Sequence, residues 1–245
     1  MMKVVAVYNL KGGVGKTTLA VNMAWCAATL SARRTLLWDL DPQAGATFLL
    51  GAEPTTEKAQ SVFAKDIAPS RLIRKTGTER LAVLPADRSL RGLDSFLFTL
   101  GKRKRLAKLL ESLAADFDRV ILDCPPGLTE TSEQVMRAAD VILIPVIPSP
   151  LSRRAFDEAV DHLHRNHAGQ AAILPVFSMA DRRRALHNAA LQADPDWPVI
   201  PMASIVEQMA SRRKPVGAFA PSSAATGAFA FLWRAVERKL AERRA

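Results

Sequence analysis

A glycine-rich loop near the start of the chain combines residue types that bind phosphate. The segment KGGVGKTT, residues 11–18, lies between a valine-rich run and a stretch with helical patterning. Glycines allow a tight turn whose backbone N–H groups point inward, and the start of a helix adds the positive end of its dipole. In such a loop Lys16 reaches the terminal phosphates and the Thr17 hydroxyl binds Mg²⁺. The expected nucleotide-binding residues are Gly12, Gly13, Val14, Gly15, Lys16, Thr17 and Thr18.

The loop departs from the usual phosphate-loop pattern G-x-x-x-x-G-K-[ST] at its first position. Gly15, Lys16 and Thr17 match the end of the pattern, but Leu10 stands where the first glycine is expected. A second lysine, Lys11, follows it. The spacing alone gives Lys11 no role, and an exposed lysine in a flexible loop is the simpler interpretation.

Three aspartates end two of the apolar runs. Asp39 and Asp41 lie in WDLDPQ, where strand alternation places them on the same side, and Asp123 opens DCPPG. An acid in the position of Asp123 matches the Walker B residue, which holds Mg²⁺ directly or through its waters. A capping or turn role would explain each acid alone. Together, beside a phosphate loop, they favour a site for a metal ion and a water.

Short apolar runs alternate with helical patterns along the chain, which predicts βαβ units and a mostly parallel sheet. We expect an α/β, doubly wound fold with helices on both faces, forming a single domain over residues 1–245. In such sheets ligands bind at the carboxyl ends of the strands. Strands are expected over residues 3–10, 34–41, 79–86, 118–127, 139–146, 170–178 and 197–201. Helices are expected over 17–30, over 93–117 with a break near Gly101, over 132–139, and over 222–245 with an interruption near Gly227.

Composition limits the class of protein and its partners. The chain has 245 residues, 49% of them hydrophobic, and no apolar run approaches the roughly 20 residues that span a bilayer. Nothing resembles a secretory signal, and Cys26 and Cys124 are interpreted as reduced packing residues of a cytosolic protein. The formal charge of +10 favours nucleic acid or an anionic membrane as a partner.

The motifs KGGVGKTT, DLDPQ and DCPPG resemble, in order and spacing, those of the ParA/MinD family of deviant Walker A ATPases. The resemblance extends to ADVILIPVIPSPLS and RRKPVGAFAPSS, and NLKGGVGKTT is more similar to the ParA branch than to the MinD branch. It implies a P-loop NTPase fold, ATP and Mg²⁺ as cofactors, slow ATP hydrolysis, and an ATP-dependent homodimer.

The resemblance also implies roles for individual residues. Lys11 is expected to reach across the dimer to the partner's nucleotide, which makes Lys11, Lys16 and Asp41 the catalytic residues. Asp41 is expected to orient the attacking water, while Thr17, Asp39 and Asp123 hold Mg²⁺ or its hydration shell. The family often has an asparagine after the sixth strand to recognise adenine. Ser178 takes that place here, so base recognition is expected to depend on backbone groups and Met179.

Basic clusters in the C-terminal part favour non-specific double-stranded DNA as a partner. No aromatic residues are interleaved with them, so contacts to phosphate without sequence readout are expected. The resemblance implies a nucleoid-associated, cytoplasmic protein that positions or segregates a cargo with a ParB-like or other adaptor. The basic segment 101–105 is a weaker candidate, and operator-specific repression is not expected because no DNA-reading domain precedes the first strand. The proposed DNA-binding residues are Arg153, Arg154, Arg182, Arg183, Arg184, Arg212, Arg213 and Lys214.

A MinD-like, membrane-associated positioning ATPase is the main alternative. Such a protein would use a C-terminal amphipathic helix with basic residues opposite an apolar face. A last helix packed on the core has the same stripe, so the membrane is the less favoured partner. The apolar positions are Phe229, Leu232, Trp233, Val236 and Leu240.

Other classes fit less well. Two distant cysteines do not support an iron–sulfur carrier, and Tyr8, the only tyrosine, does not support a tyrosine kinase with a tyrosine-rich tail. An amide-forming or carboxylating enzyme of related fold stays open, although DLDPQ favours the partitioning branch. His162, His164 and His167 do not share a helical face, so a solvated helix is expected there and not a metal site.

Overall fold

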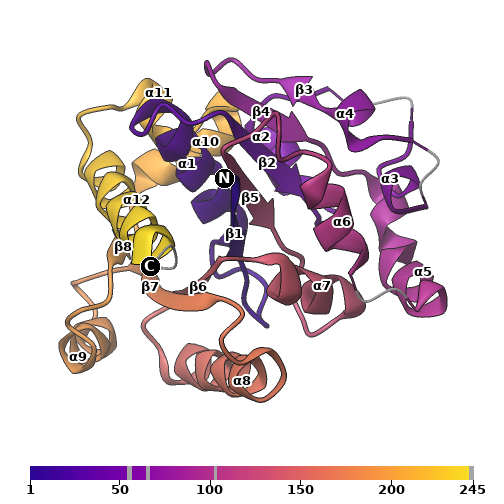
Figure 1. Ribbon diagram of the computed structural model, residues 1–245. Helices are drawn as coiled ribbons and strands as arrows, with labels where there is room; N and C mark the ends of the chain where they lie inside the picture. The colour runs from indigo at the N-terminus through magenta and orange to yellow at the C-terminus, as the bar shows by residue number, and fades with distance from the viewer. Residues whose placement is uncertain (54–56, 65–66, 102–103, 243–245) are drawn as a thin grey trace.

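A computed structural model describes residues 1–53, 57–64, 67–101 and 104–242 of the chain (Figure 1). The expected α/β, doubly wound arrangement is confirmed. An eight-stranded sheet has the order β3-β4-β2-β5-β1-β6-β7-β8, and every neighbouring pair is parallel except the antiparallel pair of β3 and β4. The strands are β1 (Lys3–Val7), β2 (Thr35–Asp39), β3 (Arg74–Lys75), β4 (Leu81–Leu84), β5 (Arg119–Asp123), β6 (Val141–Val146), β7 (Ala172–Ala180) and β8 (Val199–Pro201).

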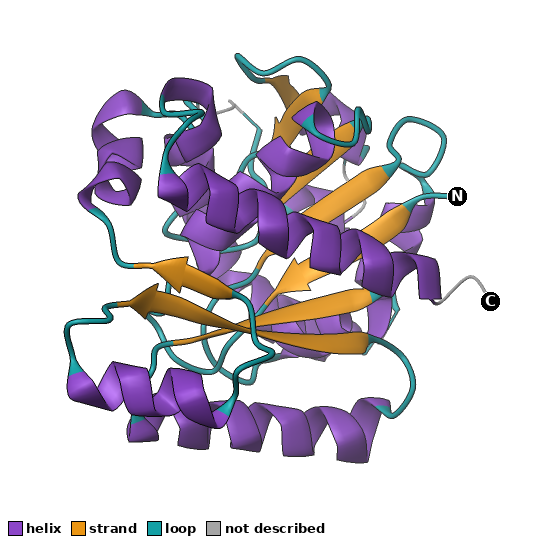
Figure 2. Ribbon diagram, turned by 90° about the vertical axis from the view of Figure 1, so that its left-hand side faces the viewer, coloured by secondary structure: helices purple, strands orange, loops and turns teal. Residues whose placement is uncertain are grey.

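Helices cover both faces of the sheet, as the turned view shows (Figure 2). The N-terminal half contributes α1 (Lys16–Thr29), α2 (Gly45–Leu49), α3 (Ser61–Ala64), α4 (Pro69–Leu72), a 3₁₀ turn η1 (Arg88–Gly92), α5 (Leu93–Leu100) and α6 (Arg105–Glu111). The C-terminal half contributes α7 (Glu130–Ala138), α8 (Pro150–His167), α9 (Ala185–Ala193), α10 (Ser204–Arg212), α11 (Val216–Phe219) and α12 (Ala224–Glu242).

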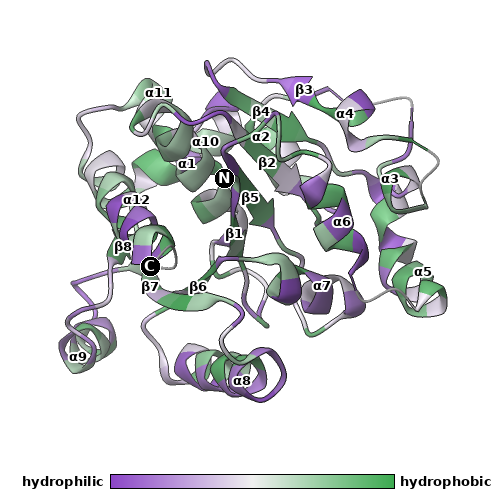
Figure 3. Ribbon diagram, in the orientation of Figure 1, coloured by the Kyte–Doolittle hydropathy of each residue, from purple (hydrophilic) through white to green (hydrophobic). Residues whose placement is uncertain are grey.

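Alternation along the strands builds two hydrophobic layers, one on each face of the sheet. In β1, Ala6 faces the cluster that contains residues of α5 to α8, while Val5 and Val7 face the cluster that contains residues of α1 and α12. All five residues of β1 are buried, and the central strands are correspondingly hydrophobic (Figure 3). The apolar runs of the sequence are therefore strands covered on both faces.

The α12 helix uses its apolar stripe to pack on the body of the protein. Phe229, Leu232 and Trp233 are at most 1% exposed, and the Trp233 indole N–H donates to Ser31 Oγ at 2.8 Å. The helix runs without a break from Ala224 to Glu242, so the expected interruption near Gly227 is wrong. Tertiary packing holds the helix through this glycine despite its low helix propensity. Among the described helices, none has both the length and the apolar character needed to cross a membrane.

Candidate nucleotide-binding site

The carboxyl ends of the central strands meet the glycine loop. In the ladders, Val7 of β1 and Asp39 of β2 both lie opposite Asp123 of β5. The loop then runs from β1 to the first turn of α1, as expected for a ligand site in a doubly wound sheet. The three sequence motifs thus come together at the carboxyl ends of the central strands.

Two loop glycines have backbone conformations that other residues rarely adopt. Gly13 has φ of 73° and Gly15, which caps the N-terminus of α1, has φ of 86°. No acidic residue lies in the first turn of α1, so the positive end of its dipole is not neutralised by a neighbouring carboxylate. The loop is therefore suited to an anion.

Lys16 is 7% exposed and its ammonium donates to the Lys11 carbonyl at 2.7 Å, which holds it across the loop. Burial lowers the pKa of Lys16, and the carboxylates of Asp123 and Asp41 partly oppose this effect. A bound phosphate would place a negative charge beside this buried ammonium and so offset the cost of burying it.

Asp123 is the residue that points most directly to a bound cation. It is 0% exposed, and neither of its carboxylate oxygens accepts a hydrogen bond of good geometry from a described residue. Burial and the neighbouring Asp39 raise the pKa of Asp123 well above the usual range, and the nearby Thr17 hydroxyl opposes this effect only in part. An unpaired buried carboxylate is costly, and Mg²⁺ prefers oxygen ligands, so the donor set fits this ion.

Asp39 organises the loop that carries Asp41. Its Oδ2 accepts from the Thr47 backbone N–H and hydroxyl, both at 2.8 Å, and its Oδ1 accepts from the Asp41 N–H at 3.1 Å. Burial raises the pKa of Asp39 to about 6. Asp41 itself is partly exposed and lies close enough to Asp39 and Asp123 to raise the pKa of both. The expected acids are therefore in one place, and Thr47 is a contributor that the sequence did not reveal.

Two further residues of the site escaped sequence analysis. Asn9 is the second residue after β1; its side-chain amide donates to the Pro145 carbonyl at 2.7 Å and its Oδ1 accepts from the Lys11 N–H at 2.8 Å. A Cβ on Gly45 would come within 3.2 Å of Thr17 Cγ2, so Gly45 allows α2 to approach the phosphate loop closely. Their positions in the sequence, shortly after the ends of β1 and β2, are a signal that could have identified them.

Lys11 points away from its own loop. Its ammonium donates to the carbonyl of Leu151, in the first turn of α8, at 2.8 Å. Leu151 is 69% exposed and Leu128, in the loop after β5, is 50% exposed. The Gly127 N–H donates to the Leu10 carbonyl at 3.0 Å, so the loop that carries Leu128 lies beside the loop that carries Lys11. Lys11 thus lies near exposed apolar residues, while Lys16 lies within its own loop.

A mostly apolar cavity of about 210 Å³ opens beside Gly15 and Thr18. Ser178 lines it but is 3% exposed, and its hydroxyl donates to the Val14 carbonyl at 2.8 Å, so Ser178 braces the phosphate loop. Met179 has φ of 52° and is 37% exposed on the cavity wall. The cavity has the character of a pocket for a flat apolar group next to the phosphate loop. Its other lining residues include Ile200, Pro201, Met202, Ala203 and Val206, which sequence analysis did not single out.

The basic residues differ in how free their charges are. Arg153 forms ion pairs with Asp157 at 3.0 Å and with Asp194 at 2.5 Å, and Arg183 pairs with Asp181 at 2.9 Å. Exposed Arg154, Arg182 and Arg184 have no ion pair among the described residues. The last three are therefore the better candidates for contacts to an anionic partner.

The cluster Arg212, Arg213 and Lys214 lies at the C-terminal end of α10, a helix on the opposite side of the molecule from α8 and α9 (Figure 1). The Arg212 guanidinium lies 4.9 Å from the centre of the Phe219 ring, and Arg213 lies 5.1 Å from that of Phe48. The basic clusters therefore occupy two separate regions of the surface.

The segment 101–105 does not form an additional basic patch at Arg105. This residue is 4% exposed, and its guanidinium donates to the carbonyls of Val62 and Phe63 at 2.8 and 2.7 Å. The expectation is wrong for Arg105 because the side chain tethers α6 to α3. Lys102 and Arg103 lie outside the described residues.

Known proteins resemble the chain both in sequence and in fold. The sporulation initiation inhibitor protein Soj of Bacillus subtilis is 38% identical over 149 residues, 60% of this chain and 58% of Soj. The chromosome partitioning protein ParA of Myxococcus xanthus is 38% identical over 147 residues, 59% of this chain and 52% of that protein. The chain thus spans little more than half the length of these two relatives.

Solved structures match nearly the whole chain. Cobyrinic acid a,c-diamide synthase from Mycobacterium smegmatis, with a bound ATP analogue and magnesium, has 28% identity and a TM-score of 0.82 over 97% of this chain and 95% of the synthase. The ATP complex of a Cyanothece McdA variant has 23% identity and a TM-score of 0.80, covering 98% and 96% of the two chains. MinD from Pyrococcus horikoshii with Mg-ADP has 24% identity and a TM-score of 0.80, covering 100% and 99%. At these two lower identities the likeness shows the shared fold alone.

The family model described as an AAA domain matches residues 2–168, which is more than half of the chain and includes all three motifs. With its Soj and ParA relatives, its phosphate loop and its buried strand-end acids, the chain belongs to the family of ParA/MinD-type ATPases.

Proposed function

We propose that this protein is a ParA-type ATPase. It binds ATP with Mg²⁺, forms a homodimer around two nucleotides, binds DNA without sequence preference in that state, and positions a cargo with an adaptor that stimulates hydrolysis. The observation that carries the proposal is that the ammonium groups of the two lysines lie in different places. Lys16 lies in its own phosphate loop, whereas Lys11 is directed outward onto Leu151 beside exposed apolar residues.

Within one subunit the residues bind and neutralise the triphosphate. The glycine loop and the N-terminus of α1 supply N–H donors, and Lys16 supplies a cation. Thr17 and Asp123 would hold Mg²⁺, with the buried Asp39 supporting its hydration shell. When bound, the ion draws charge from the phosphates undergoing transfer. Met179 and the apolar cavity would take the base.

Asp41 would orient the attacking water. It lies next to the metal-binding acids, and the Asp39 carboxylate holds its backbone N–H in place. Its proposed part in the reaction is to hold the water in line with the phosphate more than to remove a proton from it. Turnover is then slow, which suits a switch whose signal is its bound state.

Lys11 would act on the partner's nucleotide. Two triphosphates that face each other repel, and a cation from each subunit offsets that repulsion in a poorly solvated interface. In the free subunit the Leu151 carbonyl holds the Lys11 ammonium, so dimer formation exchanges this hydrogen bond for contacts with phosphate. The same cation would stabilise charge in the transition state, as an arginine finger does.

DNA is the favoured partner of the dimer. Arg154, Arg182 and Arg184 are exposed and form no ion pair within the described part of the chain, so they can contact phosphates, and dimerisation doubles the number of such contacts. The membrane alternative requires the apolar stripe of α12 to be available, but Leu232 and Val236 on this stripe are fully buried in the fold. The cargo could be a plasmid, a chromosome region or a protein microcompartment such as a carboxysome, with a ParB-like or other adaptor.

Pelleting with DNA and flotation with vesicles separate the two partners. The full chain is mixed with random-sequence DNA or with vesicles containing anionic lipid, each with ADP or a non-hydrolysable ATP analogue. We expect ATP-dependent pelleting with DNA that declines steeply as salt increases, and no flotation. Flotation with vesicles and no DNA pelleting would instead support the membrane-positioning alternative.

A further inference from the structure

Three side chains from two helices converge at a place that the proposed function does not use. Glu133 lies on α7, His162 and His167 lie on α8, and their ligand atoms are all within 4.8 Å of one another. The two helices are in direct contact, and both lie in the lower part of the molecule in Figure 1. The expectation of solvated histidines is wrong for His167, whose side chain is 1% exposed, because α7 supplies a partner that the helical spacing could not reveal.

Both histidines present the same nitrogen to one carboxylate. His162 Nε2 lies 2.6 Å from Glu133 Oε1, and His167 Nε2 lies 2.9 Å from Glu133 Oε2. The other nitrogen of His167, Nδ1, lies 3.3 Å from Gln170 Oε1. In the metal-free protein the carboxylate holds the proton on Nε2, and Gln170 Oε1 can accept the proton on Nδ1 once a metal ion takes Nε2.

We propose that Glu133, His162 and His167 form a binding site for a divalent transition metal, with Zn²⁺ as the best match. Two imidazoles and one carboxylate form one of the known zinc-binding sets, completed by a water. Zinc bonds of about 2.0–2.1 Å put tetrahedral ligands roughly 3.3 Å apart, so ligand atoms that lie within 4.8 Å of one another must shift by up to about 1.5 Å. His162 and Glu133 have exposed fractions of 19% and 21%, which gives the ion and its water access from solvent.

Arg137 is the natural competitor of the metal. Its guanidinium lies 3.2 Å from Glu133 Oε2, and its side chain is 30% exposed. Without metal, Arg137 and the two imidazole N–H groups satisfy the carboxylate. Metal binding requires each neutral imidazole to carry its proton on Nδ1 and requires Arg137 to turn toward solvent. The Asn166 amide nitrogen, which lies 3.2 Å from His162 Nδ1, must also turn away so that the amide oxygen can accept this proton. A bound metal ion would then link α7 to α8. The α7 helix follows the Asp123 loop, and the first turn of α8 contains the Leu151 carbonyl that accepts from Lys11.

Zinc titration of the EDTA-treated full chain tests the site, using competition with a chromophoric chelator. Excess Mg²⁺ and the absence of nucleotide keep the strand-end aspartates from contributing. We expect one Zn²⁺ per chain in the wild type and in the control His164→Ala, which removes an exposed histidine of the same helix. His162→Ala and Glu133→Gln should both lose this site, whereas Arg137→Gln should bind Zn²⁺ more tightly because the competing cation is gone.

Thermal unfolding distinguishes a metal site from a purely structural clasp. Zn²⁺ should raise the Tm of the wild type and of His164→Ala, but not that of His162→Ala or Glu133→Gln. Both variants change partly exposed side chains, so they are expected to fold. Absence of stoichiometric binding in the wild type, or its retention in both variants, would overturn the proposal. Equal Tm losses with and without Zn²⁺ would identify a clasp and overturn it as well.

Discussion

At the scale of single residues, the proposed binding of nucleotide and Mg²⁺ depends on acids that are already buried in the ligand-free protein. Asp39 and Asp123 are both fully buried at adjacent strand ends, and burial together with the neighbouring Asp39 raises the pKa of Asp123. Asp39 is held by Thr47 and by the Asp41 N–H, whereas Asp123 has no hydrogen bond of good geometry among the described residues. Burial of Asp123 without such a partner costs stability, which supports the proposal that this carboxylate binds a cation.

Replacing Asp123 by Asn should stabilise the nucleotide-free protein and abolish its response to nucleotide. A group whose folded pKa is raised loses stability as pH rises from its unfolded value, near 4, through its folded value. The wild type should therefore lose stability from about pH 4 upward, through about pH 6 for Asp39. At neutral pH we expect Asp123→Asn to melt about 2–4 °C higher, the shift that 1 kcal/mol gives at this size.

Thermal scans across pH, with and without ATP and Mg²⁺, provide the measurement. Wild-type protein should gain stability from ATP and Mg²⁺ and the variant should not. A lower Tm for the nucleotide-free variant than for wild type would show that Asp123 is satisfied in the native state, contrary to this account.

Asp41→Ala tests the water-orienting role separately from binding. The side chain is partly exposed and accepts only the Gln43 N–H, at 2.9 Å, among the described hydrogen bonds, so its loss should leave the fold intact. We expect ATP affinity within a few-fold of wild type and hydrolysis slower by about 10²-fold or more. The two quantities are measured by nucleotide titration and phosphate release. Wild-type turnover in this variant would exclude Asp41 from the reaction.

At the scale of secondary-structure elements, the parts that could be predicted are those with local signals. The buried strands were predicted because each is a short apolar run. The break near Gly101 was predicted because glycine readily ends a helix, and in the structure Gly101 ends α5 with φ of 60°. Only the last part of α8, around its histidines, was expected to be helical, because α8 is mostly polar with few core residues facing the sheet. The role of Ser178 at the Val14 carbonyl depends on a contact across 164 residues, which no local pattern encodes.

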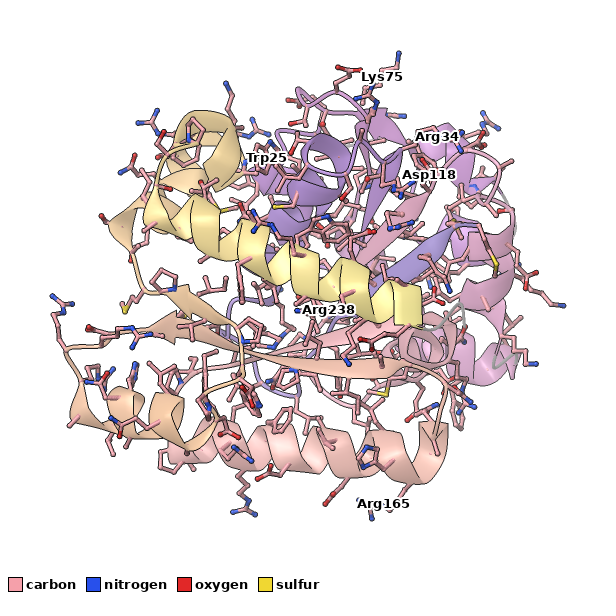
Figure 4. The ribbon with its side chains drawn as sticks, turned by 60° about the vertical axis from the view of Figure 1, so that its left-hand side comes forward. Trp25, Arg34, Lys75, Asp118, Arg165 and Arg238 are labelled. Atoms are coloured by element: carbon pink, nitrogen blue, oxygen red, sulfur yellow. The ribbon has the colours of Figure 1, made fainter. Side chains whose placement is uncertain are left out.

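Two glycines in C-terminal helices provide a matched test of packing. A Cβ on Gly217, in α11, would lie 2.2 Å from the Trp25 ring of α1, while one on Gly227, in α12, would meet nothing within 4 Å. Figure 4 shows Trp25 beside this part of the C-terminal region. Gly217→Ala should therefore destabilise the fold by about 1–3 kcal/mol. Gly227→Ala should stabilise it by about 0.5–1 kcal/mol, because Gly227 lies inside a helix.

Urea unfolding of both variants measures these changes. The two substitutions should change the free energy of unfolding in opposite directions, with unchanged m-values. If Gly217→Ala were as stable as Gly227→Ala, the close approach of α11 to α1 would be incorrect.

At the scale of the whole molecule, net charge and its placement decide the partner. Arg153 and Arg183 are engaged by carboxylates, and Arg154, Arg182 and Arg184 have no ion pair among the described residues. Charge reversal at Arg182 and Arg184 together should reduce ATP-dependent DNA binding by at least about tenfold and flatten its salt dependence, because fewer counterions are released.

A double reversal at Arg33 and Lys75 is the matched control, because both residues are exposed and the charge change is the same. Lys75, which Figure 4 labels, lies far from α9 in that view. Binding is measured by fluorescence anisotropy over a series of salt concentrations. An equal loss in both pairs would reflect total charge alone, and no loss in the arginine pair would place the DNA-binding surface elsewhere.

The central claim is that ATP joins two copies of this chain through Lys11. Light scattering coupled to size exclusion, with Mg²⁺ and a non-hydrolysable ATP analogue, measures it directly on the wild type and Lys11→Ala, with nucleotide binding to each confirmed beforehand. We predict a dimer for the wild type with the analogue, a monomer with ADP, and a monomer for Lys11→Ala in both states. A wild type that stays monomeric with the analogue bound, or a Lys11→Ala protein that dimerises equally well, would contradict the account.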